Sequence, residues 1–228
     1  MKIVNKEASK FKVIYGPAVA VDAVLFTIKE DQLNVLLIKI SKGSYKDKWA
    51  VPGGLVQLDE TLDAAAKRAL FQKTNIGDIH LEQLYSFGDL KRDTRGRVIS
   101  VAYFALIGNP RNYKLKTAPY YSEIAWWQVR KLPAMAFDHR QIVKYALERL
   151  KAKIEHTNIA YSLLPKGFTL TELQRTYEII LGRRIDKRNF RKKIIALGLV
   201  KKTGKKQKGK PHRPAQLYRF SKRELILV

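Results

Sequence analysis

The sequence predicts a chain of two domains. The first is an α/β (α+β) domain with a mixed sheet between helices, and the second is a small domain of two short helices and a basic β-hairpin. Apolar, β-branched runs dominate residues 18–129 and indicate strands. Near residues 155–160 this pattern gives way to two closely spaced helical segments with capping residues. We therefore place the domains at 1–156 and 157–228.

The composition fits two folded domains of modest size. The chain has 228 residues, of which 46% are hydrophobic and 10% aromatic, so it can bury real cores and is not of the disordered class. It has no cysteine, which excludes disulfides and thiolate metal sites. No segment approaches about 18 consecutive apolar residues. We expect a soluble cytoplasmic protein, associated with the nucleoid and without a membrane partner.

In the N-terminal domain the elements follow from hydrophobic periodicity. Residues 18–40 predict two strands with a polar break near residue 30. Residues 61–74 predict an amphipathic helix, because small apolar residues recur at spacings of three and four. Further strands are predicted over residues 81–88, 98–107 and 124–129, followed by a helix that Asp138 caps and that ends near residue 154.

The C-terminal domain reads as helix, turn, helix and hairpin. Thr169 and Glu172 form a capping-box pattern, and Gly182 can end the helix that they open. Asp186 can cap a second helix, which ends at Gly198. Two short strands, residues 199–202 and 217–220, flank a Lys-rich loop. This order of elements is the layout of a winged helix-turn-helix domain.

The charge points to a polyanionic partner. The net charge is +25, and from residue 158 onward there are about 19 Lys and Arg against about 4 Asp and Glu. Such an asymmetry indicates a polyanion, first of all a nucleic acid, and the winged-helix pattern favours double-stranded DNA. A merely basic, solvated surface is the alternative, but the charges coincide with the helix-turn-helix pattern. An RNA-binding protein is a further alternative, because charge alone does not distinguish the two nucleic acids.

The second helix of this domain has the pattern of a recognition helix. Phe190, Ile194 and Leu197 are expected to form its buried stripe, with cations on the opposite side. Arg188 and Asn189 are the expected base contacts, because Arg pairs well with guanine and Asn with adenine. The full set of expected DNA contacts is Gln174, Arg175, Lys187, Arg188, Asn189, Arg191, Lys192, Lys205, Lys206, Lys208 and Arg213.

Residues 54–76 carry a second motif. Its fixed positions match G-x5-E-x7-R-E-U-x-E-E-x-G-U, where U is apolar, at Gly54, Glu60, Arg68, Leu70 and Ile76, and differ from it at Ala69, Gln72, Lys73 and Asn75. The pattern resembles the Nudix box of pyrophosphohydrolases. In that family the acids at the positions of Ala69, Gln72 and Lys73 hold Mg²⁺ against a pyrophosphate. Alanine offers no ligand atom and lysine places a cation there, so we expect neither a metal site nor a catalytic residue.

The rest of the motif is expected to build a binding pocket. The pair formed by Glu60 and Arg68 is expected to brace the loop against the helix. Arg92 and Arg97 lie in a basic loop between two predicted strands and are expected to clamp a diphosphate. The expected ligand contacts are Trp49, Gly53, Gly54, Arg68, Tyr85, Arg92, Arg97, Ser100 and Tyr103, with Trp49 and Tyr85 stacking on a base.

Four strings together resemble one family. They are WAVPGGLVQLDETLDAAAKRAL, SFGDLKRDTRGRVISVAYFALI, LPAMAFDH and YSLLPKGFTLTELQRTYEIILGRRIDKRNFRKKI. The chain is similar over nearly its whole length to the Nudix-related transcriptional regulators of the NrtR group. The resemblance implies a Nudix fold joined to a winged helix, a homodimer, and a palindromic operator. It also implies a small-molecule effector, ADP-ribose or a sugar, with no other cofactor.

The alternative function is hydrolysis. An active Nudix hydrolase of the ADP-ribose pyrophosphatase type would have to recruit other acids, such as Glu60, Asp59 or Asp63. Repression relieved by the ligand is the commoner expectation in the family. The sequence leaves open the effector, the operator, the target genes and the direction of regulation.

Overall fold

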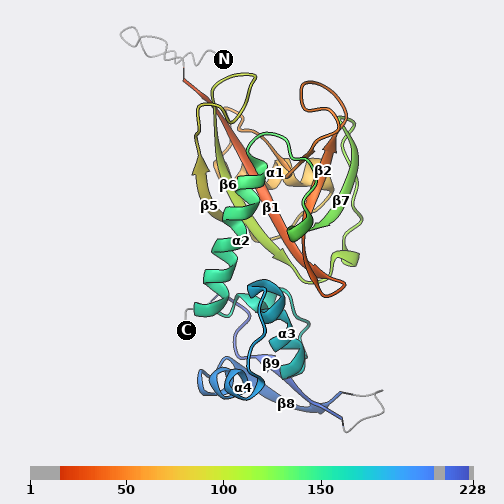
Figure 1. Ribbon diagram of the computed structural model, residues 1–228, viewed down its shortest axis with the longest axis vertical. Helices are drawn as coiled ribbons and strands as arrows, with labels where there is room; N and C mark the ends of the chain where they lie inside the picture. The colour runs from red at the N-terminus through yellow and green to blue at the C-terminus, as the bar shows by residue number, and fades with distance from the viewer. Residues whose placement is uncertain (1–15, 208–213, 226–228) are drawn as a thin grey trace.

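The computed structural model describes residues 16–207 and 214–225. A larger domain built around a sheet lies above a smaller helical domain, and one long helix reaches from the first to the second (Figure 1). No helix in the described part of the chain is long and apolar enough to cross a membrane.

The larger domain contains a mixed sheet. Its central strands are β1 (Ala18–Lys29), β2 (Gln32–Ile40) and β6 (Val98–Ile107). β1 pairs parallel with β6 and antiparallel with β2. The strands in chain order after β2 are β3 (Trp49–Ala50), β4 (Gly53–Leu55), β5 (Glu82–Phe87), β6 and β7 (Tyr121–Gln128). The path runs β3-β2-β1-β6-β5, with β4 on β1 and β7 on β2. β1 is nearly continuously apolar because both of its faces are buried.

Two helices cover the opposite faces of this sheet, α1 (Leu62–Thr74) and α2 (His139–His156). Alternate residues of β1 point to opposite sides. Val21 and Leu25 belong to the clusters on the α1 side, whereas Val24 packs with the buried side chains of α2. The predicted mixed sheet between helices is confirmed.

The smaller domain has the predicted winged-helix order. After the 3-10 helix η3 (Ile159–Ser162) come α3 (Leu170–Leu181), α4 (Lys187–Ala196), β8 (Val200–Lys206) and β9 (Gln216–Phe220). Both sides of the predicted capping box are present, since Thr169 and Glu172 bond to each other's backbone amides. Gly182, at φ 71°, ends α3, and Asp186 accepts a bond from the Asn189 amide. Two further 3-10 helices, η1 (Pro110–Asn112) and η2 (Val129–Lys131), lie in the larger domain.

The two domains share one hydrophobic core. A single cluster of buried side chains includes Val24 of β1, Leu150 and Ile154 of α2, Tyr177 of α3 and Phe220 of β9. α2 therefore belongs to both domains, because its buried stripe packs on the sheet and on the winged helix. Because the core is closely packed, a displacement of α2 changes the packing in both domains.

Two sequence-based details are wrong. Asp138 is the residue before α2 but its side chain makes no capping bond. Leu197 was expected in the buried stripe of α4, yet it is 42% exposed, while Phe190 and Ile194 are buried. The helical period ends with the helix at Ala196, and Leu199 takes the next buried position instead.

Candidate ligand cavity and DNA-binding surface

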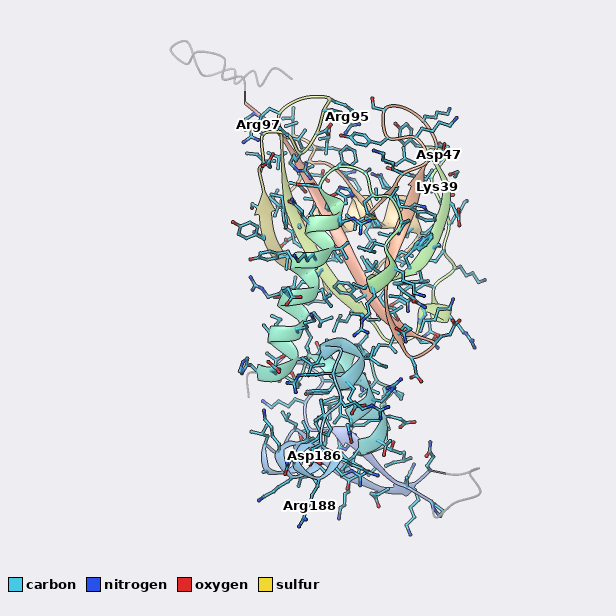
Figure 2. The ribbon with its side chains drawn as sticks, in the orientation of Figure 1. Lys39, Asp47, Arg95, Arg97, Asp186 and Arg188 are labelled. Atoms are coloured by element: carbon cyan, nitrogen blue, oxygen red, sulfur yellow. The ribbon has the colours of Figure 1, made fainter. Side chains whose placement is uncertain are left out.

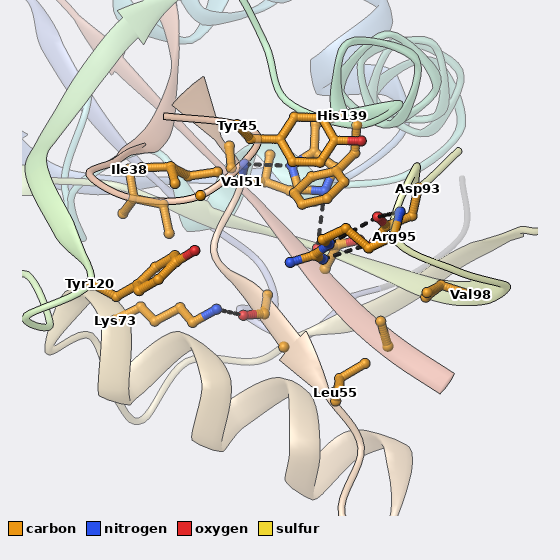
Figure 3. A pocket seen from close by; sticks show the side chains of 18 of the residues that line it. Ile38, Tyr45, Val51, Leu55, Lys73, Asp93, Arg95, Val98, Tyr120 and His139 are labelled. Atoms are coloured by element: carbon orange, nitrogen blue, oxygen red, sulfur yellow. Dashed lines mark hydrogen bonds and ion pairs between the residues drawn. The ribbon is translucent and has the colours of Figure 1, made fainter. Parts of the chain in front are cut away.

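A cavity of about 280 Å³ opens in the larger domain at the site of the motif (Figure 3). Its walls come from β1 to β4, the first residues of β6 and β7, the end of α1, the start of α2, and the loops around residues 42–45, 92–95 and 137. These segments are far apart in the sequence and meet because the sheet places them at one end of β1.

Asp22 on β1 is the buried acid of this cavity. Ser100 donates to its Oδ2 at 2.5 Å, Arg92 Nη2 lies 3.4 Å from the same oxygen, and His139 Nε2 lies 3.4 Å from Oδ1. Burial by itself raises the pKa of Asp22, but His139, Ser100 and Arg92 together lower it to about 2. Asp22 is therefore a charged anchor for three neighbouring elements.

Arg92 is committed to structure. Its Nε and Nη2 donate to both oxygens of Asp138 at 3.0 and 2.8 Å, and its side chain is 4% exposed. The expected clamp on a diphosphate requires a guanidinium with unused donors at the surface of the cavity. Arg92 does line the cavity, as expected, but the bidentate pair with Asp138 occupies its Nε and Nη2 and little of the side chain is exposed. The bidentate pair also explains why Asp138 does not cap α2.

Arg95 is the arginine of this loop that faces the cavity opening. Its Nε and Nη2 donate to the two oxygens of Asp93 at 2.9 and 2.8 Å, but unlike Arg92 its side chain is 58% exposed, so the rest of the guanidinium is accessible. Its guanidinium lies 5.0 Å from the ring of Phe137 and 5.9 Å from that of Tyr45. The two rings are themselves in contact, with centroids 4.1 Å apart. Sequence reasoning missed Arg95, Tyr45 and Phe137. A basic loop does not reveal which of its arginines faces a cavity, and the two aromatic residues come from other loops.

Lys73, at the end of α1, supplies a second cation to the cavity wall. Its ammonium donates to the backbone oxygen of Gly53 and lies 5.1 Å from the ring centroid of Tyr121. Burial lowers the pKa of Lys73 to about 8. At neutral pH the side chain is therefore mostly charged.

Gly53 and Gly54 line the cavity as expected. A Cβ on Gly53 would lie 2.0 Å from Asp22 Oδ1 and 2.5 Å from the Val21 oxygen, so no side chain fits there. A Cβ on Gly54 would lie 3.5 Å from Ala69 Cβ and 3.8 Å from Lys73 Nζ. Close approach, and not an unusual backbone angle, accounts for glycine at position 53.

Glu60 and Arg68 form the expected structural pair. Arg68 Nε donates to Glu60 Oε2 at 2.7 Å, and Arg68 Nη2 donates to the Leu55 oxygen at 3.0 Å. Glu60 Oε1 accepts the amide of Gln57 at 2.7 Å. The bond from Arg68 is the main reason that the pKa of Glu60 falls to about 2. The pair braces the loop against α1, and neither residue lines the cavity, so the expected ligand contact of Arg68 is not brought there.

Asn75 occupies the last glycine position of the motif. It ends α1 in the left-handed region at φ 61°, and its amide donates to the Phe71 oxygen. Asparagine tolerates this conformation better than most residues other than glycine. The substitution therefore keeps the helix end that the motif requires.

The structure does not bring the other expected ligand residues to the cavity. Trp49 is buried and packs edge-on against Trp127 at 5.1 Å, and Tyr85 stacks on Tyr145 at 4.9 Å. Tyr103 is 1% exposed and donates to Asp63. Ser100 donates to Asp22, and Arg97 donates to the backbone oxygens of Gly88 and Asp89. The pleat of a strand decides which face each side chain takes, and a pattern of mixed residues leaves that face undetermined.

The motif positions that bind metal in the Nudix family do not fit a divalent cation in this chain. Ala69 is buried and has no ligand atom, Gln72 accepts a bond from Arg68 at 3.3 Å, and Lys73 is a cation. Among residues 16–207 and 214–225, no group of three or more His, Cys, Asp or Glu is arranged to hold a metal. Nor do Asp59, Glu60 and Asp63 line the cavity, so the acids of the hydrolase alternative are not gathered there.

The opposite end of the molecule carries the DNA-binding surface. Arg188 lies at the far end of the long axis from Arg95 (Figure 2). Lys187, Arg188, Asn189 and Lys192 are exposed on α4, while Phe190 and Ile194 anchor the helix. This is the division of labour that a recognition helix needs, with apolar residues inside and long polar ones outside.

Three of the expected DNA contacts point elsewhere. Gln174 donates to Glu178 and to the Ile185 oxygen, which holds the turn between α3 and α4. Arg175 pairs with Asp31 of the β1–β2 turn at 3.5 Å, so it faces the larger domain. Arg191 is half-buried and donates to Thr171 of α3. α3 is held between the larger domain and α4, and these side chains hold it there.

The hairpin has its predicted place. Lys206 lies opposite Gln216 near the end of the paired strands, and both Lys205 and Lys206 are exposed. Lys208 and Arg213 lie outside the described residues.

Comparison with known proteins agrees with this arrangement. Residues 16–146 match the NUDIX domain, and residues 160–220 match the NrtR DNA-binding winged helix domain. The ADPR responsive transcriptional repressor NtrR of Acinetobacter baylyi is 44% identical over 213 residues, which is 90% of this chain and 83% of that protein. The chain belongs to the NrtR family. Like other members it is a DNA-binding transcriptional regulator with a Nudix domain.

Solved structures of NrtR from Shewanella oneidensis match both parts of this chain. Its complex with a 27mer DNA is 35% identical, with a TM-score of 0.75 over 89% of this chain and 93% of that one. Its NUDIX domain complexed with ADP ribose is 33% identical, with a TM-score of 0.55 over 64% of this chain and 94% of that one. The NrtR winged helix and the Nudix cavity thus lie in one chain here, joined by α2.

Proposed function

We propose that this NrtR-family regulator is a repressor that ADP-ribose releases from DNA, and that its Nudix domain binds this effector without hydrolysing it. The observation that carries the proposal is the cavity itself, which Lys73 of the degenerate box, Arg95 and the aromatic pair of Tyr45 and Phe137 line together. The relatives agree, because the Acinetobacter baylyi protein is named for its response to ADPR and the Shewanella oneidensis domain was solved with ADP ribose.

The cavity chemistry suits a dinucleotide-like ligand. Arg95 and Lys73 supply positive charge for a diphosphate, and both line the cavity. Tyr45 and Phe137 line it as well and offer ring faces for a base. A free pentose has no diphosphate and no base, and it would leave both features unused. This comparison favours ADP-ribose over a sugar.

The residues of the box support binding without hydrolysis. Hydrolysis of a pyrophosphate in this fold needs acids that hold a divalent cation near the phosphates. Ala69, Gln72 and Lys73 offer no such set, and Asp22 is already bonded to His139 and Ser100. A regulator benefits from this loss, because a sensor must hold its ligand long enough to report it.

α2 is the element through which the ligand would act. His139, its first residue, accepts the Val51 amide at 3.1 Å and contacts Asp22, and all three residues line the cavity. At the other end of the helix, Ile154 packs into the core shared with the winged helix. A ligand that shifts the contact between His139 and Asp22 would therefore move α2 and, with it, the winged-helix domain. Such coupling is typically worth about 1–3 kcal/mol.

The repressor would act as a homodimer on a palindromic operator. Two winged helices would then reach half-sites about one helical turn, or a multiple of it, apart. The displacement of α2 in each subunit would change the distance between the two recognition helices and lower the affinity for DNA. The protein would work in the cytoplasm with the nucleoid.

Two measurements test the proposal. Fluorescence anisotropy with the DNA upstream of the gene should show that ADP-ribose weakens binding, whereas ribose, arabinose and adenosine should not. Chromatography of ADP-ribose after incubation with the protein and Mg²⁺ should show no AMP. Release of DNA by arabinose, and not by ADP-ribose, would show that the effector is a sugar. Formation of AMP that Glu60→Gln abolishes would establish the hydrolase alternative.

A further inference from the structure

Lys73 occupies a position where an enzyme of this fold would carry a metal-binding carboxylate. It is in the last turn of α1, and its side chain turns toward the cavity beside Tyr120 (Figure 3). Its ammonium bonds to the Gly53 oxygen and sits above the Tyr121 ring. The ammonium is thus held where a bound cation would be expected.

The direct contacts of Lys73 are with uncharged groups. In the part of the chain that the structure describes, its hydrogen-bond partner is a neutral backbone oxygen and its ring contact is a neutral tyrosine. An ammonium has three donors, so a bond to Gly53 leaves two for a ligand. Tyr121 and Gly54 border the same part of the cavity and add no charge. Asp22 lies in the same cavity and attracts the ammonium, but it is already bonded to His139, Ser100 and Arg92, so Lys73 has no acid in direct contact with it.

The charge at this one position matches that of a metal-bound glutamate. One glutamate plus one divalent cation would sum to +1, which is the charge of lysine, and the other two acids of the box are replaced by the uncharged Ala69 and Gln72. An ammonium differs from a metal ion in one respect that matters for chemistry. It is not a Lewis acid that lowers the pKa of a bound water, so it attracts a phosphate without generating a nucleophile.

We propose that Lys73 is a built-in cation that binds the diphosphate of the ligand in place of a divalent metal, so that the cavity takes its ligand without Mg²⁺. The inference rests on the proposed function for the presence of a diphosphate in the ligand. It goes further in assigning the group that recognises it and in making recognition independent of metal.

The test compares Lys73→Gln with a matched control. Lys67 lies on the same helix, carries the same charge and is exposed outside the cavity, so Lys67→Gln removes an equal charge elsewhere. Calorimetry would measure the binding of inorganic pyrophosphate and of ADP-ribose to each protein, with EDTA present. For ADP-ribose the measurement would be repeated with excess Mg²⁺.

Wild type should bind both probes in EDTA, and Mg²⁺ should change its affinity for ADP-ribose by less than about threefold. Lys73→Gln should lose about 10- to 100-fold for both probes, since a charge-assisted bond is lost. Lys67→Gln should stay within about twofold of wild type. The proposal is overturned if wild type needs Mg²⁺ to bind, or if Lys73→Gln keeps wild-type affinity.

The outcomes for pyrophosphate and for ADP-ribose distinguish a failure of this inference from a failure of the proposed effector. If pyrophosphate binds through Lys73 in EDTA but ADP-ribose neither binds nor releases DNA, the built-in cation stands and the proposed effector fails. If ADP-ribose releases DNA equally from wild type and Lys73→Gln, the effector stands and the cation is rejected. The EDTA comparison on wild type needs no substitution, so a requirement for Mg²⁺ would overturn the proposal even if Lys73→Gln fails to fold. In that case Lys73→Arg, which keeps the charge, and Lys73→Met, which removes it, would test the assignment to Lys73, and equal affinity of these two variants for pyrophosphate would reject it.

Discussion

The carboxylate of Asp22 and the imidazole of His139 lie 3.4 Å apart, both buried. Asp22 belongs to β1 at the centre of the sheet, and His139 is the first residue of α2. This contact joins the wall of the ligand cavity to the helix that reaches the winged helix. A change at the cavity that alters this contact acts directly on the position of α2.

Asp22 should be the main electrostatic anchor of the larger domain. Asp22→Asn removes the charge that Arg92 and His139 face, while Arg92 keeps Asp138. We expect a loss of roughly 3 kcal/mol in the free energy of unfolding, because a buried charge cluster loses one of its partners. Urea denaturation followed by circular dichroism measures it. Asp59→Asn, at an exposed position, should change the free energy by less than about 0.5 kcal/mol.

The same carboxylate should give the protein an acid-sensitive stability. The pKa of Asp22 is lowered from 3.8 to about 2 in the folded state. A depressed pKa stabilises the fold above the unfolded value near 4, and this contribution is lost as the pH falls from about 4 to about 2. The difference amounts to about 2 kcal/mol. Unfolding free energies measured between pH 5 and pH 2 should fall less steeply in Asp22→Asn, and equal slopes would contradict the assignment.

Arg95, and not Arg97, should carry ligand affinity. Arg95→Ala removes the exposed guanidinium beside Tyr45 and Phe137, and we expect ADP-ribose to bind about 10-fold more weakly. Arg97→Ala should leave affinity within about twofold, because Arg97 donates to loop carbonyls outside the cavity. Calorimetry on both variants checks this. A larger loss of affinity in Arg97→Ala than in Arg95→Ala would instead support the sequence-based expectation that Arg97 binds the diphosphate.

Arg188 should read sequence. It is exposed near the start of α4, and Arg188→Ala should cost about 1–3 kcal/mol on the operator while affecting unrelated DNA little. Anisotropy titrations with operator and scrambled duplexes measure the difference. Lys144→Ala, which removes an exposed cation from α2, serves as the control. An unchanged preference for the operator in Arg188→Ala would show that α4 is not the recognition helix.

Lys206 should act on all DNA alike. It is exposed near the end of the β8–β9 hairpin, where a lysine meets phosphates and not base edges. Lys206→Ala should weaken operator and scrambled DNA equally and should make the plot of log affinity against log salt shallower by about one unit of slope. A loss confined to the operator would place Lys206 at a base instead.

The sequence predicted most elements because their signals are local. Capping residues such as Thr169 and Asp186, apolar periodicity on β1 and α3, and the position of Gly182 each act within a few residues of the backbone that they shape. The box itself is also local, so its losses at Ala69, Gln72 and Lys73 could be read directly. The winged helix and its basic surface were predicted for the same reason.

The sequence by itself thus determined the two folds, their order and the basic charge of the C-terminal domain. Only the tertiary structure decided which polar residues meet. Arg92 and Arg97 looked available for a ligand, but contacts from distant segments bind them to Asp138 and to loop carbonyls, while Arg95 is turned to the cavity. The ammonium of Lys73 likewise owes its position to a contact with Gly53, 20 residues away. The orientation of a polar side chain and its bonding partners depend on packing between segments that are distant in the sequence, so a local sequence pattern does not reveal them.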